Sequence, residues 1–244
     1  KSKLSGSGLF ENVVAHDRDQ GWPNLAALKT YDAVIVWGHD GRFTNEFGDA
    51  LADYVDQGGG VVVALFSTAY SAASSTRYGV PGRFKTDQYY LISSSSQGNQ
   101  NGFVKVLPNH ELLEGVNTFD AGNFSSRGAT IINNSTAVAT YSNGDPLIVY
   151  NDNIGTGGAR RVDLDLFPPS SDARSDFWKT STDGLRIMTN AIQYVANPIR
   201  STPNPTCITS PTIAFSVNGE NITSVSWDFG DNVGTSNQLS TTYT

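Results

Sequence analysis

Ser67 is the residue whose type and position come nearest to supporting catalysis. It follows Val61 to Phe66, an apolar run that predicts a buried strand, and open α/β sheets bind ligands at the ends of such strands. His16, His39 and His110 are the available general bases. The residues beside Ser67 are not the glycines that relieve a nucleophile turn. A serine nucleophile therefore stands as one hypothesis, and a helix-capping serine as the other.

A second polar group follows Ala33 to Trp37, which has the apolar composition of a strand buried on both faces. His39, Asp40 and Arg42 come directly after it, at the sheet edge where ligands bind in this class of fold. We expect these three side chains either to form a ligand-binding site or to lie on a solvated loop. His16 follows another expected strand and carries the same two interpretations.

Two pairs of aspartates are candidate metal ligands. Asp163 and Asp165 alternate with apolar residues, so a strand would place both carboxylates on one face, where they could transfer protons or hold a cation. The alternatives are ion pairs with the arginines at positions 160 and 161, or a solvent-facing strand. Asp228 and Asp231 could bind calcium or accept the backbone hydrogen bonds of a turn. No cofactor is expected.

Other residues could carry a modification or contact a ligand. The single cysteine, Cys207, excludes an internal disulfide and a cysteine-based zinc site. Aromatic side chains could stack on sugar rings if exposed, although they more often pack in a core: Trp22, Trp37, Tyr89, Tyr90 and Trp178. In a glycosylating host, the Asn-X-Ser/Thr pattern offers four acceptors that would make the chain a glycoprotein: Asn123, Asn133, Asn134 and Asn221.

The overall composition excludes several classes of protein. The 244 residues include 23 acidic and 16 basic side chains, for a net charge of −7. Without a basic cluster beyond positions 160 and 161, binding to nucleic acid is not expected. No apolar run approaches the roughly 18 residues that a membrane span needs. Charged residues make up only 16 %, and this neutral polar surface is typical of exported proteins, so we expect an extracellular or cell-surface location.

The strongest structural signal lies between Tyr31 and Tyr70, which reads as strand, helix and strand. Thr44 can cap a helix whose apolar residues recur at helical spacing: Phe47, Leu51, Tyr54 and Val55. Three glycines at positions 58 to 60 supply its end and a tight turn. Two buried strands joined by an amphipathic helix form the right-handed crossover of a parallel sheet, which predicts an α/β domain.

The segments YDAVIVW and FGDALADYVDQGGGVVVA resemble the class I glutamine amidotransferase-like superfamily, and within it the trehalose-utilisation-protein-like branch. The resemblance covers residues 1–197 and implies a flavodoxin-like three-layer sandwich with a mostly parallel sheet. Active members use a cysteine nucleophile and a His-Pro-Glu motif. The matching positions here carry Phe66-Ser67-Thr68 and Phe167-Pro168-Pro169. The resemblance therefore implies that both catalytic motifs are missing and that glutamine is not hydrolysed.

The last part of the chain has a different composition. Residues 198–211 contain four prolines and predict a stiff, extended linker. In residues 212–244, the segment Trp227 to Asp231 reads WDFGD and resembles the signature of the polycystic kidney disease (PKD) domain, which implies part of an immunoglobulin-like β-sandwich. Asn232 replaces the glycine usual in that family, and both residues tolerate a left-handed turn.

Shorter patterns complete the expected order of elements. They predict a first helix over 1–9, a strand over 12–16, helices over 25–29 and 108–113, a hairpin at Asn143-Gly144, a looser turn over 155–158, and a closing helix over 181–196. His110 is expected to cap or pack beside the second short helix. Because an α/β domain normally opens with a strand, we expect the preceding chain or another molecule to supply strands by β-augmentation.

Together these patterns predict a non-enzymatic structural or adhesive module of a larger, secreted surface, matrix or filament protein. Its expected partners are other copies or other domains of that protein, with polysaccharide as a further possibility. Two alternatives remain open. One is an accessory or carbohydrate-binding module of a secreted hydrolase, and the other is a hydrolase with a serine nucleophile.

Overall fold

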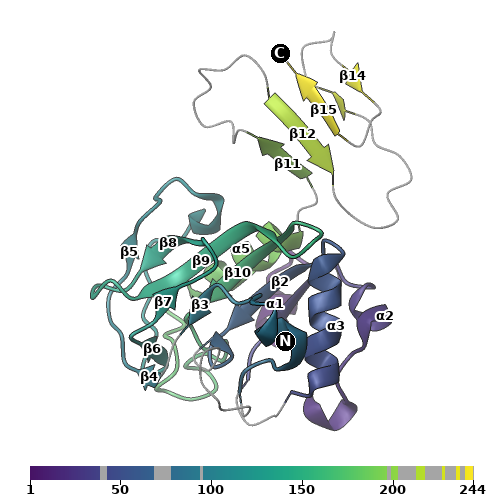
Figure 1. Ribbon diagram of the computed structural model, residues 1–244. Helices are drawn as coiled ribbons and strands as arrows, with labels where there is room; N and C mark the ends of the chain where they lie inside the picture. The colour runs from purple at the N-terminus through teal and green to yellow at the C-terminus, as the bar shows by residue number, and fades with distance from the viewer. Residues whose placement is uncertain are drawn as a thin grey trace. The chain divides into compact units, whose positions relative to one another are not determined.

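The computed structural model describes residues 1–38, 43–68, 78–93, 96–196, 199–202, 213–217, 227–228, 235–236 and 240–243. Contacts divide the chain into two compact units, Lys1–Ala196 and Asn197–Thr244. The first unit holds the large sheet with its helices, and the described residues of the second unit form short strands (Figure 1). The boundary lies beside Asn197, where the predicted α/β domain ends.

The first unit is built on a six-stranded sheet in the order β1-β2-β10-β9-β8-β5. Its parallel half consists of three strands: β1 (Ala33–Val36), β2 (Gly60–Ala64) and β10 (Ala159–Leu164). Its antiparallel half continues from β10 through three more: β9 (Pro146–Ile154), β8 (Thr136–Thr140) and β5 (Val104–Lys105). The α/β class predicted from the sequence is confirmed, with a sheet that is parallel around the predicted crossover and antiparallel beyond β10.

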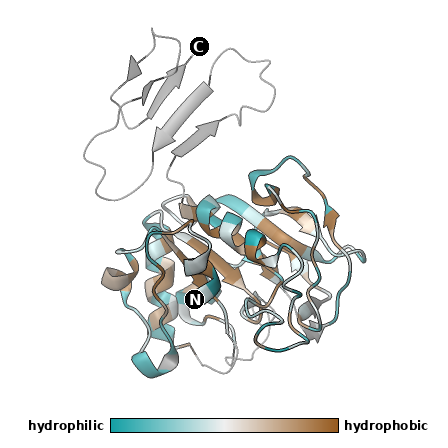
Figure 2. Ribbon diagram, turned by 180° about the vertical axis from the view of Figure 1, so that it is seen from behind, coloured by the Kyte–Doolittle hydropathy of each residue, from teal (hydrophilic) through white to brown (hydrophobic). Residues whose placement is uncertain are grey.

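Helices cover both faces of this sheet. One face packs against three: α2 (Leu25–Leu28), α3 (Asn45–Asp56) and α4 (Gly82–Thr86). The other packs against α1 (Ser2–Gly6), the 3₁₀ helix η3 (Glu111–Leu113) and α5 (Gly184–Ala196). A further 3₁₀ turn, η1, spans Arg18–Gln20. Figure 2 shows hydrophobic residues along the central strands between these layers. The three layers are compatible with a flavodoxin-like core.

The helix α3 forms as its sequence predicts. The Oγ1 of Thr44 accepts a hydrogen bond from the backbone N–H of Phe47 at 3.2 Å, which caps the first turn. Leu51 and Val55 are fully buried against the sheet. Gly48 lies against the backbone of Pro81, so closely that a Cβ atom at this position would overlap the Pro81 carbonyl. Helix α3 and the chain before α4 therefore touch backbone to backbone at this one glycine.

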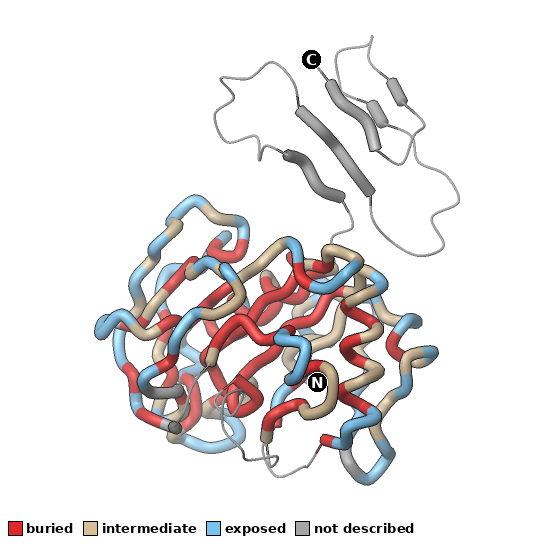
Figure 3. The backbone as a smooth tube through the Cα atoms, in the orientation of Figure 1, coloured by how far each residue is buried: buried red, intermediate tan, exposed pale blue. Residues whose placement is uncertain are grey.

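The core is densest along the strands of the crossover. All five residues of β2 are buried, whereas three of the four residues of the end strand β1 are only half-buried. Figure 3 shows the central strands in the colour of buried residues. A strand flanked on both sides and both faces loses all contact with water, while an end strand keeps one side open.

Smaller antiparallel pairs lie outside the main sheet. Two of them involve four short strands: β3 (Ile92–Ser93) with β7 (Thr130–Ile131), and β4 (Ser96–Gly98) with β6 (Ser125–Arg127). The hairpin predicted at Asn143-Gly144 is confirmed, since it joins β8 to β9 and Gly144 has a φ of +92°. The Gly144 N–H donates to the carbonyl of Tyr141 at 3.0 Å.

The strand predicted over residues 12–16 is wrong. This segment forms no ladder, and Val14 within it is exposed. A short β-branched run favours an extended backbone, but a strand also needs a partner that pairs with its N–H and C=O groups. The predicted helices over 1–9 and 108–113 are also shorter than expected, and the latter is the 3₁₀ turn η3.

The second unit is described only at its strands. Three form an antiparallel sheet in the order β11-β12-β15: β11 (Ile199–Thr202), β12 (Ile213–Val217) and β15 (Ser240–Tyr243). Two more pair separately: β13 (Trp227–Asp228) and β14 (Thr235–Ser236). Strand β11 lies within the predicted linker over 198–211, where the four residues between Pro198 and Pro203 keep their N–H groups and pair with β12.

No helix among the described residues combines the length and the apolar character that crossing a bilayer requires.

Candidate functional site

The carboxyl ends of the parallel strands β1, β2 and β10 meet at one sheet edge, where open α/β sheets bind ligands. Aromatic rings fill this edge. Phe66 follows β2 and lies 5.2 Å from Phe167, which follows β10 and lies 5.0 Å from Phe177. Phe124 and Tyr78 also pack against them. We call these five residues the aromatic cluster, and three of them, Phe66, Phe167 and Phe177, are buried.

Arg174 covers the outer side of the aromatic cluster. Its guanidinium carbon lies 4.5 Å from the ring centroid of Phe177 and 4.8 Å from that of Phe124. The same guanidinium forms two hydrogen bonds to the carboxylate of Asp176, which raise the pKa of Arg174 above its ordinary value. A cation held over two rings stabilises apolar packing at the surface.

Ser67 lies beneath the aromatic cluster and is fully buried. Its Oγ donates a hydrogen bond to the backbone carbonyl of Tyr78 at 3.0 Å. A serine nucleophile must give this proton to a general base, which a carbonyl oxygen cannot be. The neighbouring Thr68 is also fully buried, and its Oγ1 has no hydrogen-bond partner among the described residues. The hydrogen bond of Ser67 ties the end of β2 to the chain around Tyr78. Its interpretation as a helix cap stays a prediction, because residues 69–77 lie outside the described part of the chain.

The histidines proposed as bases lie elsewhere or outside the described residues. His16 is exposed, and its Nε2 lies 3.0 Å from the hydroxyl of Tyr31. His110 caps η3 as predicted, accepting from the backbone N–H of Leu112, and its ring packs on Tyr150 and Tyr194. Burial lowers the pKa of His110.

The predicted ligand site of His39, Asp40 and Arg42 lies outside the described residues, so its hypothesis stays a prediction. The candidate metal ligand Asp231, the sequon Asn221 and Cys207 are also outside them. The backbone of Asp228 belongs to β13, but its side chain is not described.

Asp163 and Asp165 do not lie on a solvent-facing strand, because both are fully buried. Asp163 pairs with Arg161 two residues before it, with 2.7 Å between Arg161 Nη2 and Asp163 Oδ1. Its other oxygen accepts the backbone N–H groups of Leu91 and Ile92 at 2.8 and 3.1 Å. The expected ion pairing is thus observed for Arg161, and the two oxygens of Asp163 together accept from three protein donors.

Arg160 does not join this pair, since it lies 3.5 Å from Asp152 instead. Asp165 lies just past the end of β10, and its backbone carbonyl accepts the hydroxyl of Tyr141. Among the described residues no three histidine, cysteine, aspartate or glutamate side chains gather to hold a metal.

The aromatic residues considered for sugar stacking are mostly structural. Tyr89, Tyr90 and Trp178 are buried, and Trp22 packs on Phe43 and Phe47. Only Trp37, which directly follows β1, belongs to the exposed class, with 37 % of its surface accessible.

The three sequons among the described residues differ in their surroundings. Asn123 and Asn134 are exposed, whereas Asn133 is half-buried. The Nδ2 of Asn133 donates to the backbone carbonyls of Gln88 and Tyr90. An N-linked sugar on that nitrogen would disturb both bonds, so Asn123 and Asn134 are the better acceptors.

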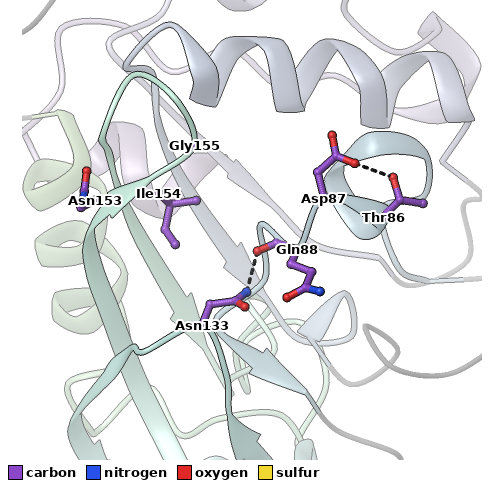
Figure 4. Close-up of a pocket in the computed structure, with 7 residues that line it drawn as sticks. All are labelled: Thr86, Asp87, Gln88, Asn133, Asn153, Ile154 and Gly155. Atoms are coloured by element: carbon purple, nitrogen blue, oxygen red, sulfur yellow. Dashed lines mark hydrogen bonds between the residues drawn. The ribbon is translucent and has the colours of Figure 1, made fainter.

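A pocket of about 320 Å³ lies away from the parallel edge. Three segments line it: residues 86–88 at the end of α4, Asn133 before β8, and residues 153–155 at the end of β9 (Figure 4). Its lining is polar apart from Ile154 and Gly155. The sequence analysis missed this pocket, because its residues lie on segments far apart in the chain and match no motif.

No family model matches the chain, and no curated protein matches its sequence. Several solved structures match the chain at low identity. The N-terminal domain of mmIFT52 is 17 % identical, covers 72 % of this chain and 81 % of its own, and gives a TM-score of 0.49. A cytoplasmic protein from Salmonella typhimurium is 14 % identical, with coverages of 72 % and 76 % and a TM-score of 0.48.

A β-galactosidase from Marinomonas ef1 is 11 % identical, with 82 % of this chain and 26 % of the enzyme covered and a TM-score of 0.39. All three TM-scores are below 0.5, so we base no statement about function on them.

Proposed function

We propose that the chain is a non-enzymatic extracellular module with a structural or adhesive role in a larger multidomain surface, matrix or filament protein. The observation that carries this proposal is the state of the two end strands of the sheet. On their outer sides, β1 and β5 have no strand partner among the described residues. Unpaired strand edges recruit further strands, which makes them natural points of assembly.

Exposed apolar side chains mark both of these ends. Trp37 follows β1 and is 37 % exposed, while Val104 in β5 and Val106 just beyond it are 45 % and 47 % exposed. Large apolar side chains gain free energy when a partner covers them. A contact between two different ends is heterologous, and repeated contacts of this kind build a filament when the rotation between subunits does not close a ring.

The sheet edge where this fold class places active sites supports the same proposal. The aromatic cluster occupies it, and the Ser67 proton is donated to a carbonyl. The serine-hydrolase alternative therefore gains no support from this edge. The neutral polar composition, with 16 % charged residues, supports the extracellular location. The alternative of a carbohydrate-binding module draws on a separate feature, the polar pocket.

Sedimentation velocity on the recombinant 244-residue chain tests the assembly role. We expect association that grows with protein concentration, because each molecule offers two open ends. The variants Trp37→Lys and Val104→Lys should reduce it, since a charge on an edge opposes strand pairing. Ile131→Lys is the matched control, because Ile131 is equally exposed but lies in β7, outside the six-stranded sheet.

A chain that stays monomeric at all concentrations and unfolds cooperatively would contradict the proposal, because neither end would then need a partner. Equal loss of association in Ile131→Lys would also contradict it, since the contact would then not involve the ends of the sheet.

A further inference from the structure

The pocket on the three segments is the feature that the assembly role leaves unexplained. Gln88 follows α4, Asn133 precedes β8, and Asn153 lies near the end of β9, yet all three line one hollow (Figure 4). Segments this distant in sequence meet at a polar surface only when the fold holds each segment in place.

Backbone geometry sets these turns apart. Only three non-glycine residues in the described parts of the chain have a positive φ: Gln88 at +64°, Asn133 at +57° and Asn134 at +52°. Two of them line the pocket, and the third is adjacent. The left-handed region is unfavourable for a residue such as glutamine, and such conformations persist where the surroundings enforce them, often at binding sites.

A specific contact enforces this geometry. The Nδ2 of Asn133 donates to the carbonyl of Gln88 at 2.5 Å and to that of Tyr90 at 2.6 Å. These two bonds fasten the turn before β8 to the turn after α4. The pocket is therefore built in advance of any ligand, which lowers the entropic cost of binding.

Three of the side chains that line the pocket are amides. The side-chain amides of Gln88 and Asn153 form no hydrogen bond with the described part of the protein, and Asn133 uses its nitrogen but not its oxygen. An amide offers both a donor and an acceptor, as does a hydroxyl group. Ile154 adds one apolar wall, which suits the C–H face of a sugar ring.

The charge of the pocket lining disfavours both anionic and cationic ligands. Asp87 is the charged residue of the lining, and its two carboxylate oxygens accept from Thr86 Oγ1 at 2.9 Å and Arg83 Nε at 3.0 Å. Because no cationic side chain lines the pocket, an anion would meet only a carboxylate. A carboxylate engaged on both oxygens is also a poor ligand for a cation.

We infer that this pocket is a binding site for neutral, hydroxyl-rich ligands, namely saccharides. Its volume is at the small end of ligand pockets, which run from about 300 to 1,000 Å³, so it suits one or two sugar rings. The site is separate from the strand ends β1 and β5. Its existence therefore does not depend on the assembly role, and either can fail alone.

Saturation-transfer NMR on the full chain tests this site. The probes are D-glucose, D-galactose, D-mannose and N-acetyl-D-glucosamine with their β-linked disaccharides, and D-glucuronate as the anionic probe. We expect saturation transfer to at least one neutral sugar and none to glucuronate. Removing one amide should weaken binding about tenfold, which corresponds to the loss of one hydrogen bond.

Two variants remove amides without endangering the fold. Gln88→Gly relieves the positive φ while deleting the side chain, so it should unfold no more easily than the parent. Asn153→Ala removes an exposed side chain. Asn109→Ala is the control, because Asn109 is also exposed but does not line the pocket.

The inference is overturned if no neutral sugar shows saturation transfer. It is also overturned if Gln88→Gly and Asn153→Ala bind as well as Asn109→Ala, since the sugar would then contact another surface. Sedimentation of the same variants keeps the two proposals apart, because loss of sugar binding should leave self-association unchanged.

Discussion

Two arginines on the same face of the sheet bind aspartates in opposite environments. Arg161 in β10 and its partner Asp163 are both fully buried. Arg83 in α4 is 40 % exposed and contacts the carboxylates of Asp53, Asp56 and Asp87. The two groups are close in space. Phe84, the residue after Arg83 in α4, has its ring centroid 4.9 Å from the guanidinium carbon of Arg161.

The difference teaches where an ion pair matters for stability. Burial raises the pKa of Asp163 and lowers that of Arg161, so both charges are held against a desolvation cost. In addition, Nη1 of Arg161 is buried and has no hydrogen-bond partner in the part of the chain that the structure describes. The charges around Arg83 stay hydrated, and solvent screens their attraction. We therefore expect the single buried pair to be far more sensitive to substitution than the larger surface group.

Arg161→Met should have the largest effect. The methionine has a similar length and packs against Phe84, but it leaves the Asp163 charge buried without its cation. We expect a loss of about 3–5 kcal/mol in the free energy of unfolding, measured by urea denaturation of the full chain. Arg186→Met, at an exposed position of α5, is the control and should change stability little. A loss below about 1 kcal/mol for Arg161→Met is what a surface ion pair would give, and it would show that burial does not make this pair more sensitive to substitution.

The double variant Arg161→Met with Asp163→Leu should be more stable than Arg161→Met alone. It removes both charges, but the backbone N–H groups of Leu91 and Ile92 lose their acceptor. Their desolvation leaves a net loss of about 1–3 kcal/mol relative to the parent. Urea denaturation of four chains, namely the parent, Arg161→Met, Asp163→Leu and the double variant, gives the comparison. Additive losses from the two substitutions would mean that the side chains do not act as a pair.

Arg83→Met should cost about 1 kcal/mol, because its side chain is 40 % exposed and its attractions are screened. The loss should shrink further in 1 M salt, where the Debye length is only about 3 Å. Urea denaturation at low and high salt measures both values. A loss that is independent of salt would show that Arg83 acts through packing instead of charge.

The smallest expected effect is on the free energy of unfolding at acid pH. Burial alone would raise the pKa of Asp56, but hydrogen bonds from the Thr156 N–H, the Tyr89 hydroxyl and Arg83 outweigh it and hold this pKa below its ordinary value of 3.8. Its stabilisation is therefore complete above the unfolded-state pKa and is lost as the pH falls through the lower, folded-state pKa. Denaturation between about pH 5 and pH 2 should show a shallower decline for Asp56→Asn than for the parent.

The sequence predicted the fold better than the sites, for physical reasons that particular residues illustrate. Apolar periodicity and capping are local, so Thr44, α3 and the Asn143-Gly144 hairpin were found where expected. Strand pairing depends on distant neighbours, which is why residues 12–16 read as a strand and form none. The pairing of Arg161 with Asp163 was foreseen as a possibility, but its complete burial was not, because no spacing rule reports the segment at Leu91 that covers it.

The pocket residues could not be found from sequence. The sequence around Gln88 does not indicate a positive φ, since glutamine rarely adopts one. Asn133 and Asn134 were noticed only as sequons. The signal that reveals the site is the hydrogen bond from the Asn133 side chain to Gln88, which exists only once the chain has folded.

The close backbone contact between Gly48 and Pro81 fixes how near the segment that follows α3 can lie to the helix. A side chain at this position would push Pro81 away from the helix, and the chain from Val80 to Ile92 would move with it. That segment supplies the N–H groups of Leu91 and Ile92 to Asp163 and the turn at Gln88 to the pocket. One absent methyl group in a helix thus sets the position of two distant features, and Gly48→Ala should disturb both together.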